Sequence, residues 1–244
     1  MTAERWDGGT AERSHGGAAR RVGRPRCRAA ALPLLPLLPL LPFLPLHAQD
    51  APAALARAER AYASATSLRA EFGQVISNPM LGDPETSNGT LFLVKPDKFA
   101  MRFAKPEGDR IVADGTWLWA YTPSTVPNQV IRQPVPTSGA ATPNLFAQFV
   151  DRPLERYDAT YGGRDTVAGE AVELVTLVPK ARDLGFRRAT VAISERTGWI
   201  RRVVIIEDSG QRRTLVLTAL TPNADVPKDE VTFTPPRGTK VVSP

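Results

Sequence analysis

Carboxylate pairs are the side chains of this sequence whose type and spacing suit acid–base chemistry. Two neighbouring carboxyl groups can divide the roles of general acid and general base between them. The pairs nearest in the sequence are Asp109/Asp114, Glu170/Glu173 and Glu207/Asp208. Asp109, Asp114 and Asp208 stand in turn sequences, where Asp is favoured because its side chain bonds to the local backbone. We therefore predict that these carboxylates are structural and that the protein is not an enzyme.

Histidine and cysteine, the other common catalytic side chains, occur only near the N-terminus, as His15, Cys27 and His47. An Arg-rich stretch there precedes the 15-residue apolar run Leu32–Leu46, which five prolines interrupt, and Ala48 follows. A basic region, a short apolar region and a small residue are the parts of a secretory signal. We predict that residues 1–48 are a cleaved signal peptide. A polyproline spacer and a membrane anchor are the alternatives.

Removal of residues 1–48 changes the chemistry that the remaining chain can perform. Residues 49–244 form one predicted domain without imidazole or thiol, so His- or Cys-based catalysis and the usual zinc sites are not expected. Seven of the 31 Lys and Arg and three of the 25 Asp and Glu lie in the predicted signal, which lowers the net charge from +6 to +2. A nucleic-acid-binding surface needs concentrated basic charge, so we predict no nucleic-acid partner.

Two helices and many strands are expected in the predicted domain. Ala51–Ala65 has apolar residues at helical spacing, and Thr142-Pro143 is a typical start for a short helix over Asn144–Val150 that Pro153 ends. Elsewhere apolar residues alternate with polar ones, and Gly, Pro, Asn and Asp separate the segments. The expected strands are 68–74, 89–95, 98–103, 111–113, 117–121, 128–133, 156–162, 170–178, 187–194, 199–207, 212–220 and 231–234, with a loop over 78–88. Strands this short and closely spaced predict an antiparallel sheet that curls or closes.

Three apolar faces carry the large side chains of the domain. They are Phe99/Met101/Phe103, Trp117/Trp119/Tyr121 and Leu145/Phe146/Phe149. Such residues can form an ordinary core, or they can line a cavity in a curved sheet that the two helices cover as a lid. Periodicity does not distinguish these two possibilities.

Several segments, in order along the chain, resemble the LolA family of periplasmic carriers of outer-membrane lipoproteins. They are Ala70–Gln74, Gly89–Phe99, Ile111–Gly115, Leu118–Tyr121, Thr142-Pro143, Asp208–Arg212 and Phe233–Gly238. The resemblance implies a mainly β (α+β) fold, in which a strongly curved antiparallel sheet forms an incomplete barrel under a lid of short helices. It also implies a monomeric carrier without cofactor, which takes lipoproteins from an inner-membrane ABC transporter and delivers them to an outer-membrane receptor.

The resemblance also implies which residues contact the acyl chains of the cargo. These are Tyr62, Phe72, Phe92, Phe99, Met101, Phe103, Trp119, Leu145, Phe146 and Phe149. Lys95 is expected to close the lid, although the family often has Arg at this position, and Lys cannot form the same forked set of hydrogen bonds. Met101 stands where the family commonly has Trp, which preserves an apolar and adaptable surface.

Three alternative functions are compatible with the residues. The same fold could carry another envelope lipid or a glycolipid, or the carboxylates could serve an envelope enzyme that uses them alone. A purely structural envelope protein is the third, and it would bind no fatty-acid probe.

Overall fold

The computed structural model describes residues 50–80, 82–135, 146–181 and 184–243. The predicted signal peptide with its cleavage site, the Thr142-Pro143 helix start and Leu145 lie outside these residues. The elements, in chain order, are α1 Ala51–Ser64, β1 Ser67–Ser77, β2 Glu85–Val94, β3 Lys98–Lys105, β4 Arg110–Asp114, β5 Trp117–Tyr121, β6 Gln129–Pro134, α2 Ala147–Val150, α3 Pro153–Arg156, β7 Tyr157–Val167, β8 Glu170–Pro179, β9 Phe186–Ser194, β10 Ile200–Glu207, β11 Arg212–Pro222, the 3₁₀ turn η2 Lys228–Glu230, and β12 Lys240–Val242.

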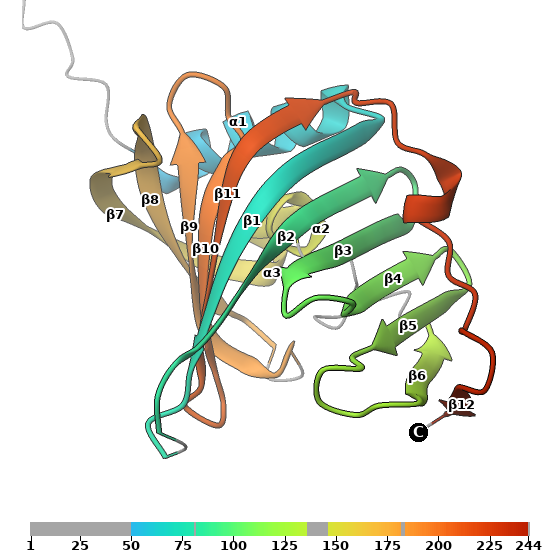
Figure 1. The fold of residues 1–244 in the computed structure, drawn as a ribbon. Helices are drawn as coiled ribbons and strands as arrows, with labels where there is room; N and C mark the ends of the chain where they lie inside the picture. The colour runs from blue at the N-terminus through green and yellow to red at the C-terminus, as the bar shows by residue number, and fades with distance from the viewer. Residues whose placement is uncertain (1–49, 81, 136–145, 182–183, 244) are drawn as a thin grey trace, which may run out of the picture. The chain divides into compact units, whose positions relative to one another are not determined.

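The strands form a single curved sheet in the order β12-β6-β5-β4-β3-β2-β1-β11-β10-β9-β8-β7. Neighbours are antiparallel except β12, which pairs with β6 in parallel. Figure 1 shows the sheet bending along this order, with α1, α2 and α3 on one side of it. The order has two ends, so among the described residues the sheet stays open. The predicted fold class, a curved antiparallel sheet covered by short helices, is confirmed.

An apolar cluster fills the space between the helices and the inner face of the sheet. α1 buries one face, made of Ala51, Ala54, Leu55, Ala58 and Tyr62, and it contacts β7, β8, β9 and α2. Many strands contribute alternate residues to the cluster, such as Leu68, Ala70 and Phe72 of β1. The period-two pattern of the strands and the 3.6-residue period of α1 therefore meet in one core.

A second apolar cluster lies on the outer face of the sheet. Phe92, Ala100, Val112, Trp119 and Val130 are buried there together with Val231, and Phe233 packs against them. Val231 and Phe233 belong to the chain that follows β11, so this C-terminal segment covers the outer face of β2–β6. The sheet is apolar on both faces in this half.

Gly89 of β2 permits a close approach between two strands. A Cβ atom on this residue would lie 2.0 Å from the carbonyl oxygen of Arg102 in β3. The register between β2 and β3 shifts at the same place, between Asn88 and Gly89. Any larger residue would push the strands apart at this irregularity.

Three expectations about the elements were wrong. β2 already begins at Glu85, so the loop expected over 78–88 is shorter. Pro153 does not only end a helix but begins α3, where its missing N–H needs no partner. Residues 231–234 form no strand, because their apolar side chains cover the outer cluster while β12 provides the last strand. None of the described helices is long and apolar enough to cross a membrane.

Candidate functional site

Most of the predicted acyl-contact residues meet in the inner apolar cluster. Phe72, Phe99 and Met101 are buried in this cluster on the inner face of the sheet, and Phe103 packs against it. The rings of Phe72 and Phe103 meet edge to face, with centroids 5.2 Å apart. The strands β1 and β3 thus present a continuous surface of large apolar side chains to the helices.

The helices complete this cluster with aromatic side chains. Tyr62 of α1 stacks on Phe146 with ring centroids 6.1 Å apart and meets Trp199 at 4.7 Å. Phe149 of α2 contacts Tyr157 and Phe186, both at 6.1 Å. Phe146 and Phe149 have no exposed surface. In this structure the helices therefore fill the inner face with their own side chains.

Two predicted site residues, Phe92 and Trp119, do not join the inner cluster. Phe92 stands between Leu91 and Leu93, whose side chains face the helices, so strand alternation directs Phe92 to the outer face. Trp119 lies in the outer cluster as well, where its ring is 5.6 Å from that of Phe233. The structure therefore places these two residues apart from Phe99, on the other face of the sheet. Leu145 lies outside the described residues.

Lys95 connects the end of β2 with the end of α1. Its ammonium group donates hydrogen bonds to the carbonyl oxygens of Tyr62 and Ala63, the latter at 3.2 Å. The last carbonyls of a helix lack partners within the helix and carry partial negative charge, so a cation is favoured there. The Lys95 N–H also donates to the Thr66 carbonyl oxygen at 2.9 Å. Lys95 thus fixes the end of α1 to the sheet.

An ion pair that the sequence analysis missed attaches the middle of α1. Arg57 of α1 pairs with Glu173 of β8, and the Glu173 side chain is only 9% exposed. Glu173 lies on the inner face of β8, where Val175 and Leu177 occupy the next inner positions. A carboxylate at an apolar position of an alternating strand was the signal that could have revealed it.

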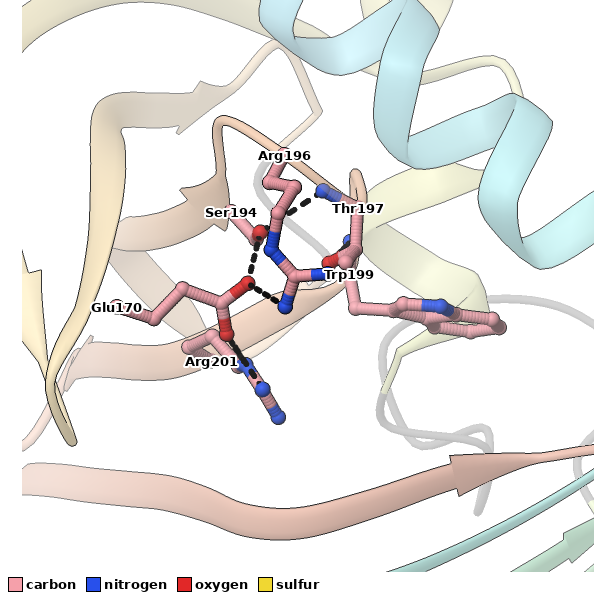
Figure 2. A network of polar contacts seen from close by, with 6 residues as sticks. All are labelled: Glu170, Ser194, Arg196, Thr197, Trp199 and Arg201. Atoms are coloured by element: carbon pink, nitrogen blue, oxygen red, sulfur yellow. Dashed lines mark hydrogen bonds and ion pairs between the residues drawn. The ribbon is translucent and has the colours of Figure 1, made fainter.

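Glu170 organises a polar network beside the turn between β9 and β10 (Figure 2). Its carboxylate accepts a hydrogen bond from the Ser194 hydroxyl and pairs with Arg196 and Arg201. Burial alone would raise the pKa of Glu170, but the hydrogen bonds from Ser194 and Arg201 and the two nearby guanidinium charges outweigh it and lower the pKa. The network holds both sides of the turn with a carboxylate that stays ionised.

The turn that this network holds packs against α1. At Gly198 the backbone adopts φ +76°, and a Cβ atom there would lie 2.6 Å from the Arg57 carbonyl oxygen. Figure 2 shows the Trp199 side chain extending away from Glu170 towards the helices. The turn therefore supports α1 closely enough that only glycine fits at residue 198.

Asp109 and Asp114 have structural roles in the described residues. Asp114 accepts hydrogen bonds from the N–H groups of Thr116 and Trp117 and from the Trp119 indole. Burial would raise its pKa, but these bonds and the charge of Lys98 lower it. Asp109 accepts from the N–H and hydroxyl of Ser124. Within the described residues, no three His, Cys, Asp or Glu side chains gather closely enough to hold a metal ion.

Comparison with known proteins identifies the family. The family model described as outer membrane lipoprotein carrier protein LolA matches residues 63–234. The outer-membrane lipoprotein carrier proteins of Methylibium petroleiphilum and Leptothrix cholodnii are 28% and 30% identical, over 72% and 71% of this chain and 82% and 78% of theirs. A solved structure of an uncharacterized conserved protein from Thermus thermophilus shares the fold, with a TM-score of 0.52 and 15% identity over 80% of this chain and 99% of that one. The chain therefore belongs to the LolA family of outer membrane lipoprotein carrier proteins.

Proposed function

We propose that this protein is a periplasmic chaperone that binds the acyl chains of lipoproteins and carries them across the envelope. It would receive them from an inner-membrane ABC transporter and deliver them to an outer-membrane receptor. Residues 1–48 would direct its export and be removed after Ala48. Family membership supports this function, since the curated relatives carry the name of outer-membrane lipoprotein carrier.

The observation that carries the proposal is an apolar inner face on which the covering helices pack through apolar side chains. The acyl chains would contact Phe72, Phe99, Met101 and Phe103 of the sheet once Phe146 and the helix residue Phe149 move away. The side chains of these two phenylalanines are buried within the cluster, so a ligand could take their place only after they are displaced. When acyl chains displace these side chains, the apolar contacts of the phenylalanines are replaced by apolar contacts of the ligand. The net change in free energy is then small, which suits reversible binding.

A lid that closes without cargo also explains how release is possible. Each methylene group transferred from water contributes about 0.8 kcal/mol, so a long acyl chain would bind too tightly to leave an open site. If the closed state is preferred, the free energy of opening is subtracted from the binding free energy. We propose that Lys95 contributes to this preference, because it fixes the end of α1 in the closed state.

The decisive experiment is mass spectrometry of the protein purified from the cell envelope. We expect a co-overproduced lipoprotein to co-purify, whereas the same cargo with its acylated cysteine replaced by alanine should not. Absence of the acylated cargo would contradict the proposal, as would equal recovery of both forms, because binding would then not depend on the acyl chains. Co-purification of a glycolipid or another lipid instead would favour the alternative carrier function.

A further inference from the structure

Three tyrosine hydroxyl groups are buried in the inner cluster without a hydrogen-bond partner among the described residues. They belong to Tyr62, Tyr157 and Tyr161. Tyr62 and Tyr157 are 6% and 1% exposed, and Tyr161 packs against the same cluster. Buried hydroxyl groups usually have a partner, because a hydroxyl that leaves water without one loses its hydrogen bonds uncompensated. Phenylalanine would fill nearly the same volume without that cost.

The three hydroxyl groups come from α1 and β7, whose tyrosine side chains belong to the same inner cluster. Tyr62 lies in the last turn of α1, and Tyr157 and Tyr161 lie on the same face of β7, which α1 contacts. Tyr62 and Tyr157 each pack against an aromatic residue of the 146–150 segment, Phe146 and Phe149 respectively. They would therefore be uncovered by the same displacement that exposes the apolar surface.

The tyrosines are suited to act as donors. Burial raises the pKa of Tyr62 well above its ordinary value, and burial also raises the pKa of Tyr157 against the opposing charge of Arg156. Both groups keep their proton at neutral pH, so each offers an O–H in an apolar environment. A hydrogen bond formed there is stronger than one in water.

We propose that the hydroxyl groups of Tyr62, Tyr157 and Tyr161 donate hydrogen bonds to the carbonyl oxygens that join acyl chains to the cargo. Ester and amide linkages each present such a carbonyl oxygen, whereas an ether-linked alkyl chain presents only the weaker ether oxygen. The site would then select acylated ligands over equally apolar alkylated ones. This inference rests on the proposed function, because it requires the acyl chains to enter the inner cluster.

The test compares two synthetic probes with the same hydrocarbon content. One is a lipopeptide whose cysteine carries a dipalmitoylglyceryl group with ester linkages, and the other is its dihexadecyl ether analogue. We expect Tyr62→Phe, Tyr157→Phe and Tyr161→Phe each to weaken binding of the ester probe about three- to tenfold, which corresponds to one hydrogen bond. Binding of the ether probe, which has no carbonyl oxygen, should change much less. Tyr121→Phe, on the outer face beside Phe233, should change neither affinity.

The outcomes separate this inference from the proposed function. Equal weakening for both probes, or no weakening for either, would overturn the role of the hydroxyl groups while leaving the carrier function intact. Failure of the unmodified protein to bind either probe would count against the carrier function itself. The melting temperature supplies a second measurement. It should stay constant or rise in the phenylalanine variants, and a fall of several degrees would show that the hydroxyl groups are bonded within the ligand-free protein, which also overturns the inference.

Discussion

Lys95 joins the sheet to the end of α1 through a single side chain. Its stem extends from the end of β2, and its ammonium group meets the carbonyl oxygens of Tyr62 and Ala63 at the end of α1. The contact combines hydrogen bonds with the interaction between a cation and the helix dipole. Because this contact can exist only while α1 lies on the sheet, we propose that it favours the closed state of the lid.

Replacement of Lys95 by Met, which keeps much of the apolar stem, should lower the free energy of unfolding by about 1–2 kcal/mol. The same change should increase the affinity for the ester lipopeptide, because less free energy is spent on opening. Chemical denaturation and a binding titration measure the two effects. Lys105→Met, at an exposed position of β3, is the matched control. Weaker binding with unchanged stability would argue against a role of Lys95 in lid closure.

At the scale of the element, α1 is a helix that depends on its attachments. Its apolar face packs into the inner cluster, Lys95 holds its end, and the Arg57–Glu173 pair holds its middle. A buried ion pair adds little net stability, but removing one partner leaves the other charge uncompensated. The main effect of the pair is therefore to fix the position of α1 on the sheet.

Arg57→Met should therefore destabilise the protein by about 3 kcal/mol, because Glu173 would remain buried without its partner. The double variant Arg57→Met/Glu173→Leu should recover most of this loss, since the charge and its need for a partner disappear together. Urea denaturation curves provide the comparison, with Arg60→Met on the exposed face of α1 as the control. A double variant no more stable than the single one would show that Glu173 does not depend on Arg57.

The individual strands and helices show how much of this structure the sequence predicts. Alternation and turn residues predict most strands, and the spacing of Leu55, Ala58 and Tyr62 predicts α1. Alternation also shows that a strand has two different faces, but it does not tell which one meets the helices. The sequence therefore groups Phe92 and Trp119 with Phe99, whereas the structure places these two residues on the outer face, which is apolar as well. Its cover, the segment around Val231 and Phe233, becomes apparent only when the chain after β11 is placed in three dimensions.

At the scale of the whole molecule, cargo binding should change the local stability of the helices that cover the inner face and not that of the sheet. We expect the amide hydrogens of α1 to exchange faster when the ester lipopeptide binds, because α1 then loses its contacts with the inner cluster. Amides of the central strands β1, β10 and β11 should remain protected. Hydrogen exchange read by mass spectrometry measures both, and the same peptide without acyl chains is the control. Greater protection of α1 in the complex would mean that cargo binds without displacing it.

The strand β7 is at one end of the sheet order, and this affects how readily the protein aggregates at high concentration. An edge strand can recruit further chains by backbone pairing, which is a common start of aggregation. In β7 the register with β8 shifts between Tyr161 and Gly163, Gly163 has φ +98°, and the charged Arg164 and Asp165 follow. An irregular, charged edge is a poor template for another strand. In the proposed cycle, the apolar interior can open for cargo many times while the edge next to it discourages one molecule from adding to another.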